Sequence, residues 1–580
     1  MRYTARKILT LLVTMLVVSL LTFAAFDMIS GDPAATLLGT QATPEKVEAL
    51  RTEMGLNRPM LVRYGEWLAG FFTGNLGVSF QYRQPVQALL GPKMLVTLCL
   101  SLVSFLLITV VSLPLGLLSA NGKLEGLHTA LNQFCMAVPP FFTGILISWV
   151  FGITLHAFVP GDFPGLDKNL GKSLVYLFFA AVSIAIPRVA MTVRMLRSTV
   201  ISEMNKPYVR TAIARGNDRR QVLGPCAEKL PGAHRHLPGS DHGGDRGGQH
   251  RGGAGVLHPR PGADAGGLHF QPGLPGGGGH RGDPGLLGGT LRHPGGSGQP
   301  LRRSPDGRNG QMKKRNPYLT AGLVMTGILT ALIVMGVFWT PYDPNAMAAG
   351  PKLAGPSLAH LMGTDGFGRD IFSRVLKGAG TTYGIALCTV AIGAVCGTVL
   401  GAVTGYFGGI VDDVLMRLGD VLTAFPSILL ALVVISLLGP GKTGNVIIAL
   451  GLVFIPSFAR VTRGAYAGLR DVNYVKSARL MGASSGRILW RHILPNTWSV
   501  LLPALTIGFN NAVLAEASMS YLCIGVTPPD ASLGYMLSES QGMFVSAPWY
   551  ALGTGLTLVW MIFGVGLIGE GLQRRNGGDV

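Results

Sequence analysis

Long apolar segments recur along this chain of 580 residues, and they restrict it to a narrow set of folds. Of all residues, 48% are hydrophobic and only 13% are charged. An α-helix needs about 20 apolar residues to cross the hydrocarbon core of a bilayer. A helix also satisfies its own peptide groups in a solvent that offers them no partners. The pattern therefore predicts an all-α fold, a polytopic bundle of transmembrane helices.

Ten apolar segments are predicted to cross the membrane, four before residue 224 and six after residue 311. They cover about 8–28, 95–120, 133–155, 174–193, 318–339, 383–407, 414–438, 446–458, 500–526 and 550–568. Basic residues precede the first segment, which is too long for a signal peptide and lacks a small-residue cleavage site. We therefore interpret it as a membrane helix whose N-terminus lies in the cytoplasm.

A basic stretch between two of these segments, 474–496, has an earlier partial copy at 208–223. When Gly482 is aligned with Gly216, Tyr474 meets Tyr208, Val475 meets Val209 and Ala478 meets Ala212. Excess positive charge places both stretches on the cytoplasmic side. Small residues such as Ser477 would let another surface approach the backbone, and Pro495 is predicted to end a helix. Two matching copies favour a shared docking loop over two unrelated basic loops.

Several function classes are disfavoured by composition. The formal net charge is +19, but much of it flanks apolar segments, so nucleic acid is not a predicted partner. The six cysteines form no C-x-x-C pair, and no metal site is predicted. No G-x-x-x-x-G-K-[ST] motif occurs, so no cofactor is expected in this chain and ATP would be used by partner subunits. Ser101, His128 and Asp162 fall in unrelated elements, so no catalytic residues and no enzyme activity are predicted.

Residues 225–311 differ from everything around them. Roughly a third are glycine, and eight of the twelve histidines fall here. A flexible linker is one interpretation. A metal-binding tract is another, although the histidines lack regular ligand spacing. A third is translation out of frame, and we favour it because the copy that begins at Tyr208 stops after Leu223.

The reading frame itself supports the third interpretation. Read one nucleotide later, the codons for Pro225–Lys229 permit a sequence similar to His492–Asn496, which continues the interrupted copy. Met312 and Lys313 must begin ATG-AA, so the shifted frame meets the stop codon TGA there. The rival is a natural fusion, which has to explain the interrupted copy. The chain is thus predicted to divide into 1–224, a linker at 225–311, which should have no compact fold, and 312–580.

The repeated loop resembles the cytoplasmic EAA loop of ABC importer permeases, with Lys476 and Arg210 at the acidic position. The resemblance implies a short coupling helix that seats in a groove of a cytoplasmic ATPase. It assigns that role to Tyr474, Lys476, Ser477, Ala478, Gly482, Arg487, His492, Leu494, Pro495, Tyr208, Arg210, Ala212 and Gly216.

Two outer regions resemble the permeases of dipeptide, oligopeptide and nickel importers. Residues 30–79 are similar to the first subunit, and 360–374 are similar to the H-x-x-G-T-D-x-x-G-R-D signature of the second. The signature residues are Gly363, Thr364, Asp365, Gly368, Arg369 and Asp370. A turn-rich external loop is the alternative interpretation of this second region. The resemblance implies two permease halves joined head to tail, with the first lacking its last two helices and transport impaired.

The resemblance also implies partners and location. ATPase subunits, an external solute-binding protein and membrane lipid would be the partners, in the plasma membrane of a bacterium (the inner membrane if Gram-negative). The cargo is a peptide, nickel, glutathione or a related solute. An ion-coupled secondary transporter is the alternative, for which Asp412, Asp420 and Glu516 are the carboxylates in or near spans. A membrane scaffold is disfavoured by the paired loops.

Overall fold

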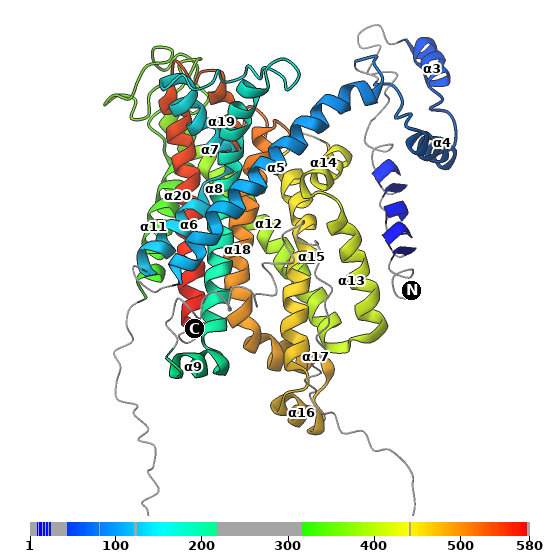
Figure 1. The fold of residues 1–580 in the computed structure, drawn as a ribbon, viewed down its shortest axis with the longest axis vertical. Coiled ribbons are helices and arrows are strands. Elements are labelled where there is room, and N and C mark those ends of the chain that lie inside the picture. Colours follow the sequence, from blue (N-terminus) through cyan, green and yellow to red (C-terminus); the bar gives the residue numbers. More distant parts are fainter. Residues whose placement is uncertain are drawn as a thin grey trace, which may run out of the picture. The chain divides into compact units, whose positions relative to one another are not determined.

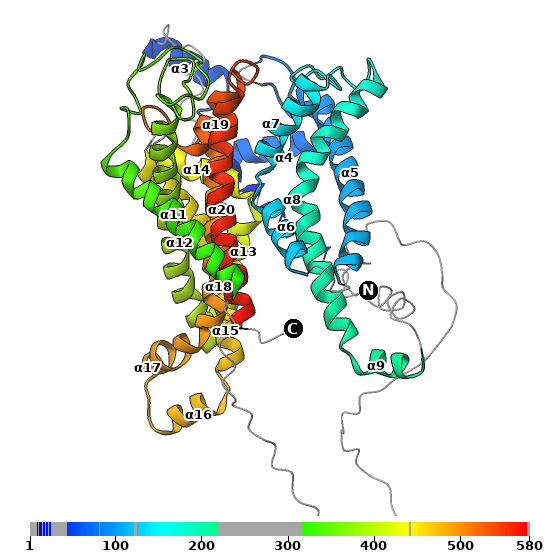
Figure 2. The ribbon, with the colours of Figure 1, turned by 90° about the vertical axis from the view of Figure 1, so that its left-hand side faces the viewer.

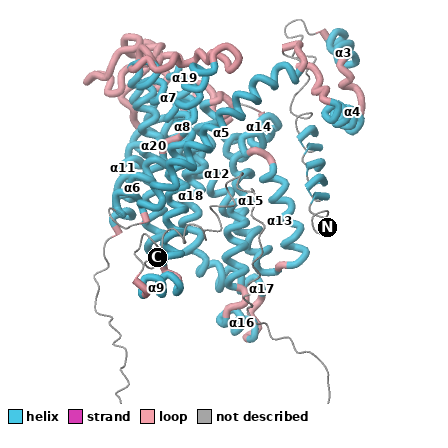
Figure 3. The backbone as a smooth tube through the Cα atoms, in the orientation of Figure 1, coloured by secondary structure: helices cyan, strands magenta, loops and turns pink. Residues whose placement is uncertain are grey.

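A computed structural model describes residues 43–79, 82–120, 125–216, 316–439 and 442–576, with most positions between 8 and 24 (Figure 1). These residues form helices and loops but no β-strand, as Figure 3 shows. Within this part of the chain, seven helices are long and apolar enough to span a membrane, and two bent helix pairs pass the same test. The predicted all-α transmembrane fold is therefore confirmed. Residues 225–311, and the prediction about their lack of a fold, lie outside the described residues.

The elements before residue 217 form a first series. They are α3 (Pro44–Glu53), α4 (Met60–Thr73), α5 (Val86–Ser119), α6 (Glu125–Ala137), α7 (Pro140–Ile147), the π-helical turn η2 (Ser148–Thr154), α8 (Leu170–Met204) and α9 (Pro207–Ala214). α5 packs against α8, and α9 follows α8 after a short turn.

The second series begins with α11, and its α-helices from α12 to α16 repeat the order of α5 to α9. It comprises α11 (Pro317–Phe338), α12 (Ile371–Phe407), α13 (Gly409–Ala424), α14 (Ser427–Leu438), α15 (Thr443–Leu469), α16 (Asn473–Leu480), α17 (Ser485–Arg487), η3 (Ile488–Ile493), α18 (Leu494–Tyr521), α19 (Leu533–Gln541) and α20 (Pro548–Asn576). α12 and α15 correspond to α5 and α8, and α16 corresponds to α9. The described residues of the first series hold no counterpart of α18 to α20.

Two of the predicted spans are not single straight helices, because each consists of a bent pair of helices. The segment predicted at 133–155 bends by 91° between α6 and α7, and the segment at 414–438 bends by 93° between α13 and α14. Prolines cause both breaks. Pro139 precedes α7 and Pro426 precedes α14. A proline lacks the N–H of a continuing helix and disfavours helical geometry in the residue before it.

The prediction that Pro495 ends a helix is wrong. It lies in the first turn of α18, directly after η3, and 485–521 forms one long helical segment. A first-turn proline gives up an N–H that has no partner within the helix anyway. The π-helical turn absorbs the change of hydrogen-bond register before it.

A stripe of glycines packs α12 against α15. A Cβ at Gly397 would lie 2.6 Å from the Cβ of Phe458, and one at Gly393 would lie 2.8 Å from the Cβ of Phe454. Gly401 and Gly405 continue the stripe at the same spacing of four residues. Small residues at this spacing let two membrane helices approach backbone to backbone. This contact forms the centre of the second series.

The largest hydrophobic core joins the two series. It contains Phe142 and Ile145 of α7 together with residues of α11, α12 and α18 to α20. Phe142 is 1% exposed. The broken α6–α7 pair therefore belongs to the same packed body as the second series.

Candidate functional site

α16 is fixed to the rest of the second series through one face. Val475 and Ala478 are buried in a cluster with Ala402, Tyr466 and residues of η3. The hydroxyl of Tyr466 donates to the backbone oxygen of Leu489 at 3.1 Å. Ala478 therefore contacts this chain's own core, and is not available to a partner as the sequence interpretation expected.

Gly482 ends α16 in a left-handed conformation. Its φ is +80°, and its N–H donates to the oxygen of Arg479 at 3.0 Å. The N–H of Ala483 donates to the oxygen of Ala478 at 3.0 Å, which completes the capping pattern. No atom of the described residues lies within 4 Å of a Cβ placed at Gly482. The glycine is thus needed for its backbone conformation, and the space beside it is open.

The opposite face of α16 and its turn is open to a partner. Leu480 is 89% exposed and Met481 is 81% exposed, two large apolar side chains beside each other. The exposed positions also include Tyr474, Lys476, Ser477, Arg487 and Pro495, whereas His492 and Leu494 are half-buried. An exposed apolar pair rimmed by cations is typical of a protein interaction site.

α9 repeats this construction in the first series. Val209 is fully buried and packs against Met204 and Ala212. Tyr208 donates from its hydroxyl to Glu203 at 2.7 Å, while Arg210 is exposed. Gly216 follows with a φ of +89°. Figures 1 and 2 show α9 and α16 at the same end of the bundle, opposite to α19.

The signature residues of the external loop form a packed scaffold. Gly363 and Gly368 have φ values of +75° and +73° and lie against neighbouring backbone. The Thr364 hydroxyl accepts from the N–H of Ala354 at 2.9 Å. Asp365 accepts from the N–H groups of Phe367 at 2.8 Å and Arg369 at 2.9 Å. These side chains hold the loop in shape.

Asp370 begins α12. One carboxylate oxygen accepts from the N–H of Ser373 at 2.8 Å and from its hydroxyl at 2.7 Å. The other lies 2.9 Å from Nδ1 of His360. The ring of His360 lies 4.7 Å from that of Tyr342. Asp370 therefore caps the helix and anchors the loop at once.

Glu539 of α19 connects this loop to the last two helices, and the sequence interpretation missed it. Its carboxylate accepts from Arg369 at 3.1 Å, from Arg374 at 2.8 Å and from the Tyr550 hydroxyl at 2.8 Å. Burial lowers the pKa of Arg369, but the carboxylates of Asp365 and Glu539 outweigh this and raise the pKa above its ordinary value. Arg369 and Glu539 are 170 positions apart in the sequence, so no local sequence pattern predicts their contact.

A second polar cluster joins the two series near the end of α20. The Glu570 carboxylate, 10% exposed, accepts from Arg194 of α8 at 3.0 Å and from Gln133 of α6 at 3.1 Å. Arg574, one turn later, donates to Glu570 at 3.0 Å and to Thr129 of α6 at 3.1 Å. α8 leads directly into α9, so this cluster connects one candidate loop to the C-terminal helix.

The carboxylates considered for ion coupling are engaged in the fold. Asp412 pairs with Arg463, and Asp420 pairs with Arg460 at 3.0 Å. Glu516 is fully buried in α18 and accepts from the Ser520 hydroxyl at 2.7 Å. Its enclosure favours a structural role. Among the described residues, no group of three His, Cys, Asp or Glu could hold a metal ion.

Sequence comparison defines the class of protein. The profile of the family described as "Binding-protein-dependent transport system inner membrane component" matches residues 112–224 and 397–577, about half of the chain. The N-terminal domain of such membrane components matches residues 1–102. The chain belongs to this family. It is a membrane component of a binding-protein-dependent importer and not an ion-coupled transporter, and its place is the plasma membrane of a bacterium.

Individual relatives narrow the resemblance. Over 263 residues the chain is 35% identical to a dipeptide transport system permease protein of Alkalihalophilus pseudofirmus, covering 45% of this chain and 85% of the relative. It is 39% identical over 273 residues to a putative peptide transport system permease protein of Brucella abortus, covering 47% and 92%. It is 40% identical over 267 residues to a glutathione transport system permease protein of Escherichia coli, covering 45% and 86%. The resemblance to ABC importer permeases is confirmed.

Proposed function

We propose that this chain forms the membrane path of an ATP-driven importer of peptides or peptide-like solutes, and that α9 and α16 contact its ATPase subunits. The observation that carries the proposal is the repeated loop. In each copy a short helix is anchored by a buried valine, at Val209 or Val475, and ends at a left-handed glycine. ATP binds to the partner subunits, and a separate binding protein delivers the cargo.

The anchoring explains how a movement of the ATPases reaches the membrane. Val475 and Ala478 are packed against α15 and η3, so a displacement of α16 is passed on to α15 and α18. Packed interfaces switch between discrete arrangements instead of deforming gradually. The exposed apolar pair, Leu480 and Met481, supplies the contact with the partner.

The cargo class follows from the relatives. The relatives compared above are named as permeases for dipeptides, peptides and glutathione, and all three kinds of cargo are peptides. We assign peptides to this chain on that similarity, ahead of nickel.

The domain boundaries belong to the same proposal. The first half is 1–224, the second is 312–580, and 225–311 is an out-of-frame product. The family profile supports this division, because it stops at residue 224 in the first half and extends to 577 in the second. The fused chain would then transport poorly. Resequencing the locus is the check, because an intact frame without a stop codon before Met312 contradicts the frameshift.

The docking role is tested by co-purification of the full chain with its ATPase subunits. Aspartate at both Leu480 and Met481 should abolish co-purification, because it puts charge on an apolar contact. Leu358→Asp is the matched control, since Leu358 is fully exposed on the external loop. Undiminished co-purification of the double variant contradicts the assignment.

A further inference from the structure

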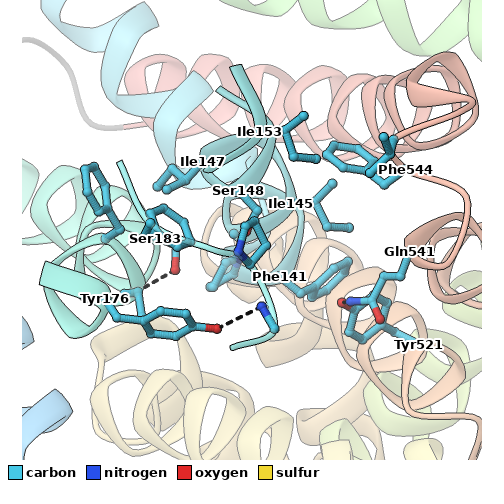
Figure 4. A pocket seen from close by; sticks show the side chains of 18 residues that line it. Phe141, Ile145, Ile147, Ser148, Ile153, Tyr176, Ser183, Tyr521, Gln541 and Phe544 are labelled. Carbon is cyan, nitrogen blue, oxygen red and sulfur yellow. Dashed lines mark hydrogen bonds between the residues drawn. The ribbon is translucent and has the colours of Figure 1, made fainter. Parts of the chain in front are cut away.

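A cavity of about 610 Å³ lies between the two series, and the transport role alone does not explain it (Figure 4). The first series contributes one face of α7, one face of α8 and the loop at 158–161. The second contributes Tyr521 at the end of α18, Gln541 of α19 and the turn that follows with Phe544 and Val545. This volume is in the range of small-molecule sites, roughly 300–1,000 Å³.

The wall of the cavity is aromatic. Phe141 stacks on Tyr521 across the two series with ring centroids 4.9 Å apart. Phe158 stacks on Phe179 at 5.1 Å and meets Tyr176 edge to face at 5.3 Å. These rings are half-buried, so part of each faces the open space. An aromatic guest could extend these stacks, and such ring pairs contribute about 0.5–1.5 kcal/mol beyond area burial.

The polar groups in the wall are few and uncharged. None of the lining residues is Asp, Glu, Lys, Arg or His. The hydroxyl of Tyr176 accepts from the N–H of Gly161 at 3.3 Å, and Ser183 donates to the oxygen of Ala180 at 2.7 Å. The Gln541 side chain donates to the Tyr521 hydroxyl. A charged guest would lose its hydration without gaining an ion pair, which is costly.

The wall on the α19 side is firmly held. Glu539, two residues before Gln541, is fixed by Arg369, Arg374 and Tyr550. Phe544 is buried, and its ring lies 6.5 Å from that of Trp149. The cavity is therefore bounded by preformed elements of both series, as small-molecule sites usually are.

We propose that this cavity binds the aromatic or large apolar side chain of a peptide cargo. The proposal rests on the proposed function and sharpens it, because it predicts preference within the peptide class. A peptide with a central phenylalanine should bind, and one with a central glutamate should not. Glutathione, which carries charge and no large apolar side chain, should bind poorly.

The test uses the full chain purified into lipid nanodiscs, without ATPases. A tripeptide with a central benzoylphenylalanine is the photoreactive probe, and Ala-Phe-Ala and Ala-Glu-Ala are the competitors. We expect labelling within α7, α8 or residues 521–545, with Ala-Phe-Ala competing at least ten times more strongly. Equal competition overturns the proposal. Labelling that added phospholipid displaces and Ala-Phe-Ala does not also overturns it, because the occupant is then an acyl chain.

Two variants fill the cavity from different sides. At Gly144 a new Cβ would lie 3.9 Å from the Ser183 hydroxyl, so Gly144→Leu enters the space without a backbone clash. Val545→Trp fills the cavity from a position that is 78% exposed. It is the alternative variant if Gly144→Leu fails to fold. Each should weaken binding at least tenfold. Gly327→Leu on α11, where no atom lies within 4 Å of the new Cβ, is the control and should change binding less than twofold.

Retained peptide binding by Val545→Trp contradicts the site. This readout involves no ATPase, so it separates failure of the cavity from failure of the proposed coupling role. If the chain retains its ATPases but binds no aromatic peptide, only the cavity proposal is contradicted. If the chain binds the peptide but retains no ATPase, only the docking proposal is contradicted.

Discussion

α5 and α12 occupy the same place in the two series, yet their surroundings differ. In the most apolar window of 18 residues, 6% of α5 is buried and 44% of α12 is buried. α12 packs against α11, α15, α18, α19 and α20, whereas the main partner of α5 is α8. The sequence of each helix is compatible with a membrane, so the difference lies in the neighbours. Among the residues that the structure describes, only the second series therefore contains the helices that cover this position on all sides.

The helices of the second series also pack more closely than those of the first. Four glycines let α12 lie against α15, and a Cβ at Gly401 would meet the backbone oxygen of Ala459 and lie 2.9 Å from the backbone nitrogen of Arg463. In the first series, Gly116 is the close glycine of α5, and the three atoms nearest to its Cβ all belong to the Leu196 side chain, beginning with the Leu196 Cβ at 2.9 Å. At Gly401 the added methyl would meet backbone atoms of α15, whereas at Gly116 it would meet one side chain of α8, which a smaller helix shift can relieve. The second series is thus the more rigid platform, and the first depends on it through α7 and Glu570.

The largest expected effect is on the α12–α15 contact. Gly401→Ala should lower the free energy of unfolding by about 3 kcal/mol through overpacking against backbone. Gly116→Ala should cost less, about 1 kcal/mol, because it crowds one side chain instead of backbone, and a small shift of α8 relieves the contact. Thermal unfolding of the full chain in detergent measures both.

Gly384 provides the matched control on α12. A Cβ there meets nothing within 4 Å, so Gly384→Ala should be neutral or stabilise by up to about 1 kcal/mol through helix propensity. Equal losses at Gly401 and Gly116 would remove the distinction between a rigid and an adaptable half.

The next effect is on the link between the series. Glu570→Ala leaves Arg194 and Arg574 without their carboxylate, and we expect a loss of about 2 kcal/mol in unfolding free energy. Glu66→Ala is the control, since its pair with Arg58 is exposed on both sides and is worth about 0–1 kcal/mol. If the two variants unfold alike, Glu570 does not connect the halves.

A smaller and equal effect is expected at the two loop glycines. Alanine at Gly482 or Gly216 must adopt a positive φ, which costs roughly 1–2 kcal/mol. Asparagine should be tolerated better in both copies. Gly486→Ala in the same loop should have no effect, because nothing lies near its Cβ and its φ is ordinary. Thermal unfolding and ATPase retention are the readouts, and a loss at only one glycine would show that the copies are not equivalent.

Labelling of introduced cysteines tests the orientation without affecting stability. Asp365 is fully buried, so Leu358 is the better external probe. In a chain whose six native cysteines are replaced by serine, Leu358→Cys should react only from outside and Met481→Cys only from inside. The reverse pattern would invert the assigned topology.

Much of this organisation could be predicted from the sequence. Apolar length predicted the membrane helices, and the match of Tyr474 and Gly482 to Tyr208 and Gly216 predicted two equivalent loops. The bends were missed although Pro139 and Pro426 stood in the apolar runs, because run length alone does not reveal direction. The glycine spacing of four on α12 is present in the sequence and is typical of closely packed membrane helices.

The remaining features depend on contacts that only the fold creates. Glu539 meets Arg369 across 170 residues, and Gln133 meets Glu570 across 437. Neither pair has a spacing that a local motif could show. Ala478 was expected to be open to a partner but is buried. The sequence of a short helix does not show which of its faces packs against the rest of the protein. The cavity is likewise assembled from two halves of the chain.

The most direct test of the central claim is photo-crosslinking in membranes that contain the chain and its ATPase subunits. Benzoylphenylalanine placed at Met481 and at Arg215, its aligned position in the first copy, should each crosslink to an ATPase subunit, while the same group at Leu358 should not. Crosslinking from both loops supports two equivalent docking helices. Crosslinking from neither, or from Leu358 instead, would contradict the account.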